Sequence, residues 1–214
     1  MNRNDEALNY FYKMKKKTSS LEYPIKYQYL TALYKIKDFE KFRKEAFLCQ
    51  MRSKEYFNSI TKLMGISMIV DSSKLENSEV FLLNYDEDER ESIDEFIQRK
   101  NESDFKSKTL AGVFSAIVPG SGKIYTNNIG DGITSLVLTG LFSYLAYENF
   151  AKDHPTRGWI FTGITAFFYA GNIYGSVLAA QNYNIGLRYN FENDIELFLK
   201  KKNYFTPQLD FICD

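Results

Sequence analysis

The stretch that decides the fold runs from Thr109 to Leu187 and reads TLAGVFSAIVPGSGKIYTNNIGDGITSLVLTGLFSYLAYENFAKDHPTRGWIFTGITAFFYAGNIYGSVLAAQNYNIGL. It carries few charges, although 25% of the 214 residues in the chain are charged. Most charged residues lie in residues 1–108 and 188–202. Because ionised side chains are costly inside a bilayer, this separation is typical of a membrane protein. The sequence therefore predicts a charged helical domain joined to a small transmembrane unit.

The first apolar piece, residues 109–118, is too short to cross a bilayer as a helix, which takes about 20 residues. It ends at Pro119, which disfavours a continuing helix. We therefore expect an interfacial or re-entrant helix, followed by a structural turn built from Pro119, Gly120 and Gly122.

Two longer apolar pieces follow, and each is long enough for a transmembrane helix. The first covers residues 132–147, with Asp131 as its cap and Glu148 close to the membrane surface. A polar loop, residues 152–157, separates it from residues 158–187, which hold no charged residue. The predicted fold is all-α, with a two-span transmembrane hairpin after the short helix.

Small residues recur along both predicted spans at helical spacing, and such residues let two transmembrane helices approach closely. The Gly171–Gly175 pair gives the clearest pattern of this kind. We expect the two spans to pack on each other through these positions, and a homo-oligomer formed through the same pair is the alternative. The predicted helix-packing residues are Gly132, Gly140, Gly163, Gly171, Gly175 and Ala179.

Uncharged polar residues also lie in or near the second span, where they could hydrogen-bond across the hairpin. They are Asn172, Gln181, Asn182 and Asn184.

The N-terminal part of the chain has apolar residues at helical spacing, which predicts several amphipathic helices. The segment Tyr29–Phe42 resembles a tetratricopeptide-type helical hairpin, with Asp38 as the expected N-cap of its second helix; an irregular helical bundle is the alternative. We divide the chain into a tetratricopeptide-like interaction domain (1–105), a membrane domain (106–187) and an amphipathic C-terminal tail (188–214). The first of these is expected to fold alone.

Several classes of function find no support in the sequence. The balanced charge of 27 basic and 27 acidic residues argues against nucleic-acid binding. The single histidine, His154, lies in a polar loop and offers no catalytic triad. Cys49 and Cys213 lack metal-ligand spacing, and Gly120–Lys123 lacks the flanking residues of a phosphate-binding loop. We predict no catalytic residues, no cofactor and no metal.

Two blocks of the membrane unit resemble a known family. Residues 115–125, SAIVPGSGKIY, followed by Gly130–Gly132, are similar to the Ser-Ala-x-x-Pro-Gly-x-Gly-x-x-Tyr signature of small bacterial membrane proteins related to the TM-two domain family. Residues 171–176, GNIYGS, followed by residues 179–184, resemble the second block of a bacterial subgroup. In that subgroup the unit often follows tetratricopeptide-like helices and is sometimes found beside the membrane-protein insertion efficiency factor, a module with no counterpart in this sequence. The resemblance implies a role in envelope or membrane-protein biogenesis and no catalytic residues.

Positive charges near the spans predict the orientation in the membrane. Lys152 and Arg157 lie in the loop between the spans, and a larger group lies on the side of both termini: Arg99, Lys100, Lys106, Lys108, Arg188 and Lys200–Lys202. We therefore expect a multi-pass protein of the bacterial inner membrane with both termini in the cytoplasm. No signal-peptide pattern follows Met1, so insertion through the internal segments is expected; a missing leader would place the N-terminal domain outside.

The function predicted from these observations is that of a non-enzymatic integral membrane protein, an adaptor or scaffold in envelope or membrane-protein biogenesis. Its expected partners are the lipid bilayer and a protein that binds the N-terminal helices. The alternative is an oligomeric membrane protein that handles a small solute or a lipid, with the break at Pro119–Gly122 lining a cavity.

Overall fold

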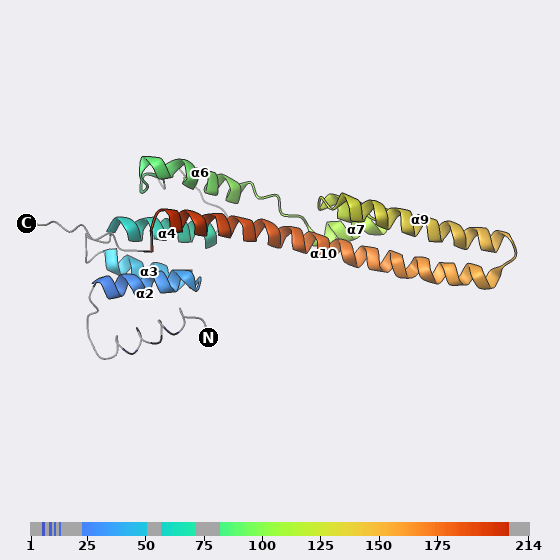
Figure 1. Ribbon diagram of the computed structural model, residues 1–214, viewed down its shortest axis with the longest axis horizontal. Helices are drawn as coiled ribbons and strands as arrows, with labels where there is room; N and C mark the ends of the chain where they lie inside the picture. Colours follow the sequence, from blue (N-terminus) through green and yellow to red (C-terminus); the bar gives the residue numbers. More distant parts are fainter. Residues whose placement is uncertain are drawn as a thin grey trace, which may run out of the picture. The chain divides into compact units, whose positions relative to one another are not determined.

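The computed structural model describes residues 6, 9, 11, 13, 23–50, 57–71 and 82–205. This part of the chain is helical and contains no strand, which confirms the prediction of an all-α fold (Figure 1). The chain divides into two compact units, which we call unit 1 (residues 1–103 and 191–214) and unit 2 (residues 104–190). Cys213 lies outside the described residues.

Unit 1 is a helical bundle with one apolar core. Its helices are α2 (Tyr23–Lys35), α3 (Phe39–Gln50), α4 (Phe57–Asp71), α6 (Glu87–Asn101) and the last turns of α10 (Pro155–Lys201). Each contributes fully buried side chains to the core, among them Leu30, Phe42, Ile66, Ile93 and Leu199. Burial of these apolar side chains is the main force that holds the bundle together.

The turn between α2 and α3 is closed by its own backbone. Lys37 adopts the left-handed conformation with φ 62°, and the Asp38 amide donates to the Leu33 carbonyl at 3.1 Å. This is the pattern in which a helix ends on a left-handed residue. The Asp38 carboxylate then accepts a hydrogen bond from the Lys41 amide at 3.2 Å, so Asp38 caps α3 as predicted.

Helix α6 begins with a reciprocal cap between Asp86 and Glu89. Glu89 is buried, and its carboxylate lies 2.7 Å from the Lys62 ammonium of α4. Lys62 also lies 2.5 Å from the more exposed carboxylate of Asp86. The start of α6 is therefore tied to α4 by a largely buried ion pair.

The C-terminal end of α10 is part of the unit 1 core, although the sequence pattern suggested a separate amphipathic tail. Ile195, Phe198 and Leu199 are buried in it. The Tyr27 hydroxyl of α2 donates to the carbonyl of Tyr204, which follows the helix. Unit 1 therefore combines two segments that are far apart in the sequence.

Unit 2 is built from α7 (Lys108–Ile117), α8 (Ser121–Tyr125), α9 (Ile129–Ala151) and the first part of α10. Helix α7 is short and ends before Pro119, as the sequence predicts. Helix α9 begins at Ile129, three residues before the predicted start, so Asp131 lies in its first turn rather than at its cap. Helices α9 and α10 run antiparallel, joined by a turn near His154 (Figure 1).

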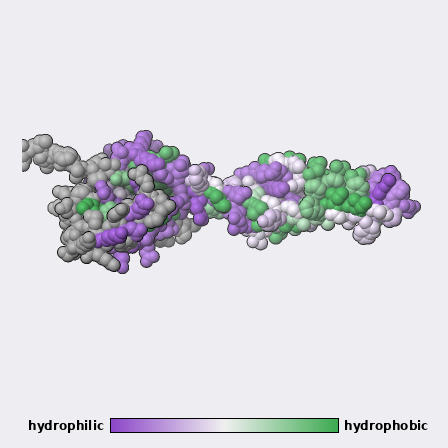
Figure 2. Space-filling model, turned by 60° about the horizontal axis from the view of Figure 1, so that its bottom comes forward, coloured by the Kyte–Doolittle hydropathy of each residue, from purple (hydrophilic) through white to green (hydrophobic). Residues whose placement is uncertain are grey.

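Of the helices in the described part of the chain, α9 alone is both long and apolar enough to cross a membrane. Only 17% of its apolar window is buried, whereas the core helix of a soluble protein would be mostly buried. Figure 2 shows apolar residues gathered on unit 2 beside a hydrophilic end. Exposed apolar residues of α9 and α10 include Ile133, Val137, Leu141, Trp159, Ile160 and Phe167. This surface identifies α9 as a candidate membrane span.

Candidate functional site

Unit 2 holds its helices together through small and polar residues. Ser115 of α7 and Ser176 of α10 are fully buried, and their hydroxyl oxygens lie 2.6 Å apart. Ser176 donates its one proton to the Asn172 carbonyl at 2.9 Å, so Ser115 is the donor in the serine pair. The Ser115 oxygen in turn accepts from the Gly122 amide at 3.0 Å. This chain of hydrogen bonds joins α7, α8 and α10.

The turn predicted at Pro119, Gly120 and Gly122 brings backbones into direct contact. Gly120 has φ 90°, and a Cβ at this position would lie 2.0 Å from the Gly132 carbonyl oxygen. A Cβ on Gly122 would lie 1.9 Å from the Ala111 carbonyl oxygen. Only glycine allows α8 to lie this close to α7 and α9.

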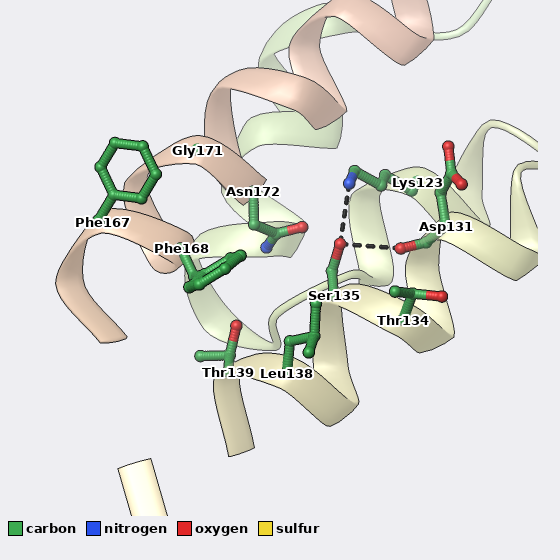
Figure 3. Close-up of a pocket in the computed structure, with 10 residues that line it drawn as sticks. All are labelled: Lys123, Asp131, Thr134, Ser135, Leu138, Thr139, Phe167, Phe168, Gly171 and Asn172. Carbon is green, nitrogen blue, oxygen red and sulfur yellow. Dashed lines mark hydrogen bonds between the residues drawn. The ribbon is translucent and has the colours of Figure 1, made fainter. Parts of the chain in front are cut away.

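A pocket of about 260 Å³ opens beside this turn, between α8, α9 and α10 (Figure 3). Lys123 reaches into it from α8 and donates to the Ser135 hydroxyl at 2.8 Å. Ser135 donates to the backbone carbonyl of Asp131 at 2.8 Å. The Lys123 side chain passes over Gly175, where a Cβ would lie 3.3 Å from its Cε. Lys123 forms no ion pair with a carboxylate in the described part of the chain.

Two buried polar side chains that line the pocket have no hydrogen-bond partner. The amide nitrogen and oxygen of Asn172 are both unpaired, and the residue is only 4% exposed. The hydroxyl of Thr139 is also unpaired, at 6% exposure. A buried polar group without a partner costs about 1–3 kcal/mol. The pocket therefore offers hydrogen-bonding capacity that the protein itself does not use.

The pocket lining combines charged and uncharged polar groups. These are the Lys123 ammonium, Asp131, the hydroxyls of Thr134, Ser135 and Thr139, and the Asn172 amide. Among the described residues, no group of three or more histidine, cysteine, aspartate or glutamate side chains could hold a metal ion.

The predicted helix-packing residues fall into two groups. Gly132 is buried against Gly120 and Ile124, and Gly175 lies under Lys123. By contrast, a Cβ would meet no atom within 4 Å at Gly140, Gly163 or Gly171. Ala179 is partly buried.

Helix α10 instead buries the stripe one residue further along, which is Asn172, Ser176 and Ala180. The contact between α9 and α10 includes stacked aromatic rings, with the ring centroids of Phe142 and Phe168 5.2 Å apart. Close packing through Gly171 against a second copy stays a prediction.

The polar residues near the two predicted spans differ in the hydrogen bonds and ion pairs that they form. Asn184 exchanges two hydrogen bonds, of 2.8 and 2.9 Å, with the backbone of Lys106, ahead of α7, rather than bonding across the hairpin. Asn172 makes no side-chain hydrogen bond. Glu148 pairs with Lys152 at 2.5 Å within the turn region.

The sequence reasoning missed Lys123, Ser135 and Thr139 as pocket residues. Ser135 and Thr139 follow Asp131 at steps of four, which places all three on one face of a helix. In the sequence, Lys123 belongs only to an incomplete phosphate-loop pattern and gives no other signal of a site. A search for polar residues at helical spacing within the apolar stretch could have found the α9 face.

A Gly122→Ala substitution tests the close approach of α7 and α8. We expect a loss of about 1–3 kcal/mol, because the new methyl group would clash with the Ala111 backbone. The measurement is the thermal unfolding of the full-length protein in mild detergent. Gly140→Ala is the matched control, since its Cβ meets no atom within 4 Å; equal melting temperatures for both variants would contradict the assigned contact.

No protein-family model, curated protein or solved structure matches the chain.

Proposed function

We propose that this chain is a non-enzymatic integral membrane protein, in which a two-span hairpin of α9 and α10 anchors a helical domain that binds another protein. The observation that carries this proposal is the exposure of α9, which is apolar over a length sufficient to span a bilayer and yet is scarcely buried. In a membrane, lipid would cover this apolar surface, whereas in water it would remain exposed to solvent.

The second span is supported by how α10 distributes its polar residues. The region 158–187 holds asparagine, serine and threonine, which lower its mean hydropathy even though it has no charge. Asn172 and Ser176 are buried, whereas Trp159, Ile160 and Phe167 are exposed. Polar residues that face the inside of the unit are compatible with a membrane-spanning helix. In this arrangement α10 crosses the bilayer beside α9, while α7 is an interfacial or re-entrant helix.

The role of unit 1 as an adaptor is supported by apolar side chains exposed on its helices. Phe47 and Leu48 on α3 and Met68 on α4 are each more than two-fifths exposed. Where exposed apolar residues form a contiguous patch, they can mark a protein-binding surface. The tetratricopeptide-like character of α2 and α3 and a task in bacterial envelope or membrane-protein biogenesis belong to the same proposal.

Site-directed labelling tests the two-span topology. With Cys49 and Cys213 replaced by serine, single cysteines are introduced as Thr156→Cys in the turn and Glu102→Cys ahead of α7. We expect a membrane-impermeant maleimide to label Thr156→Cys in intact cells from outside the inner membrane, and Glu102→Cys only after permeabilisation. Labelling of both sites from the same side would contradict the two-span hairpin, and labelling of Glu102→Cys alone would reverse the orientation.

A second candidate function is the handling of a lipid or small solute. The observation that favours it is the pocket, in which Asn172 is buried without a partner beside Lys123. Partner isolation separates the two: a mild-detergent pull-down that recovers a stoichiometric protein supports the adaptor, and recovery of an oligomer with tightly held lipid supports the second candidate.

A further inference from the structure

The pocket between α8, α9 and α10 is polar at one end and apolar at the other. Lys123, Asp131 and Ser135 lie at the polar end, while Leu138, Phe167 and Phe168 lie at the mainly apolar end, beside the hydroxyl of Thr139 (Figure 3). Asn172 projects into the space between the two ends in the same view. A pocket with this gradient fits an amphiphile rather than a wholly polar solute.

The change from a polar to an apolar lining runs along α9, from its first turn toward its middle. Asp131 lies in the first turn of the helix, and Leu138 follows it by about 10 Å at 1.5 Å per residue. If α9 crosses the bilayer, its first turn lies at the level of the lipid head groups, and Leu138 lies in the hydrocarbon region. The polar end of the pocket is then at the depth of head groups and the apolar end at the depth of acyl chains.

The polar end has unused capacity for an anionic oxygen. Lys123 is hydrogen-bonded to a neutral hydroxyl and forms no ion pair among the described residues. The Asn172 amide, buried and unpaired, supplies two further N–H donors. A lysine ammonium is a common ligand for phosphate, and hydrogen bonds to a charged group are about twice as strong as neutral ones.

We propose that this pocket binds the phosphate-bearing head group of a membrane phospholipid, with Lys123 and Asn172 as its ligands. The acyl chain continues along Leu138, Phe167 and Phe168. The Asp131 carboxylate accepts a hydrogen bond from the Asn128 side chain, so the contacts in the pocket favour a phosphate without selecting a particular head-group alcohol. The inference rests on the proposed placement of unit 2 in the bilayer, and it names a ligand for the second candidate function.

The test is native mass spectrometry of the full-length protein, delipidated in mild detergent and titrated with phosphatidylethanolamine. Diacylglycerol with the same acyl chains serves as the ligand without a phosphate. We expect Lys123→Gln and Asn172→Leu each to weaken phosphatidylethanolamine binding by about tenfold or more, the equivalent of about 1.4 kcal/mol. Binding of diacylglycerol is expected to be weak and equal in all variants.

Lys108→Gln is the matched control, because it removes the same charge from an exposed position on α7 outside the pocket lining. It is expected to bind phosphatidylethanolamine like the wild type. If Lys123→Gln does not fold, the lipid affinity of Asn172→Leu is the deciding measurement. The native Asn172 side chain makes no hydrogen bond that this change would break.

Three results would overturn the proposal. Equal binding of phosphatidylethanolamine and diacylglycerol by the wild type would remove the role of the phosphate. Unchanged lipid affinity in Asn172→Leu would mean that the lipid binds elsewhere, without the Asn172 amide as a ligand. Displacement of the lipid by inorganic phosphate at similar concentrations would make this a site for a free anion. None of these results bears on the topology, which the cysteine labelling tests separately.

Discussion

A fragment of residues 1–105, which the sequence pattern predicts to fold alone, is instead expected to remain without a stable tertiary fold, whereas residues 1–103 joined through a flexible linker to residues 191–214 fold cooperatively. The reason is that the core of unit 1 includes Ile195, Phe198 and Leu199. Full burial of such side chains contributes about 1.5–3 kcal/mol each. Their loss therefore removes an amount comparable to the whole stability of a small domain, about 5–15 kcal/mol.

Near-ultraviolet circular dichroism and chemical unfolding of the two fragments measure this difference. A single substitution gives the same test in the intact protein. We expect Leu199→Ala to destabilise unit 1 by about 2–5 kcal/mol. Leu197→Ala is its control, because Leu197 lies on the same helix and is exposed. A cooperative unfolding transition in the fragment 1–105 would show that the C-terminal segment is dispensable for this fold.

The second large effect is expected for Lys62→Met, which leaves the buried Glu89 carboxylate with no cation in contact. The side chains of Lys62 and Glu89 are only 11% and 5% exposed. Removal of one partner from a buried ion pair costs about 3–5 kcal/mol, because an uncompensated charge remains. Hydrogen exchange of amides in α4 and α6 measures this loss within unit 1.

Two further variants separate the ion pair from general effects of the substitution. The double variant Lys62→Met with Glu89→Leu is expected to recover most of the loss, because no isolated charge remains. Lys200→Met removes a lysine from an exposed pair with Glu196 and is expected to change stability by less than about 1 kcal/mol. Similar losses for Lys62→Met and the double variant would contradict the assigned role of the buried charge.

The pKa of Lys62 sets the pH range of this contribution. Desolvation by burial lowers this pKa. The hydrogen bonds and charges of Asp86 and Glu89 raise it by a larger amount, so that the pKa of Lys62 lies above its ordinary value of 10.5. The stability that comes from this shift is fully present below pH 10.5 and is lost as the pH rises through the higher folded value. At neutral pH the pair therefore contributes in full.

Local features of the fold could be predicted from the sequence because they depend on neighbouring residues. The break at Pro119 follows from the geometry of proline, and the cap at Asp38 follows from its side-chain oxygen next to a helix start. The change from charged to apolar sequence also lies close to the division between the two units at residue 104. These signals act over a few residues and need no knowledge of the tertiary structure.

Long-range pairing could not be predicted in the same way. Ile195, Phe198 and Leu199 form an apolar stripe, and a stripe does not reveal which part of the chain will cover it. The same limit applies to α10, where Gly171–Gly175 and Asn172–Ser176 have identical spacing on adjacent faces. The structure buries the second pair, of which Ser176 is hydrogen-bonded to Ser115 of α7 whereas the Asn172 side chain has no partner. The pocket is not evident in the sequence for the same reason, since Lys123 and Asn172 line one pocket only in the folded unit.

Trp159 allows the most direct test of the account, because it is the single tryptophan of the chain and lies 69% exposed on α10. The full-length protein is reconstituted into phospholipid vesicles that contain lipids brominated at defined depths. If the α9–α10 hairpin lies in the bilayer, Trp159 fluorescence is blue-shifted and is quenched most by bromines near the membrane surface, where tryptophan residues concentrate. Emission like that of tryptophan in water, unquenched at every depth, would contradict the placement of this hairpin in the membrane.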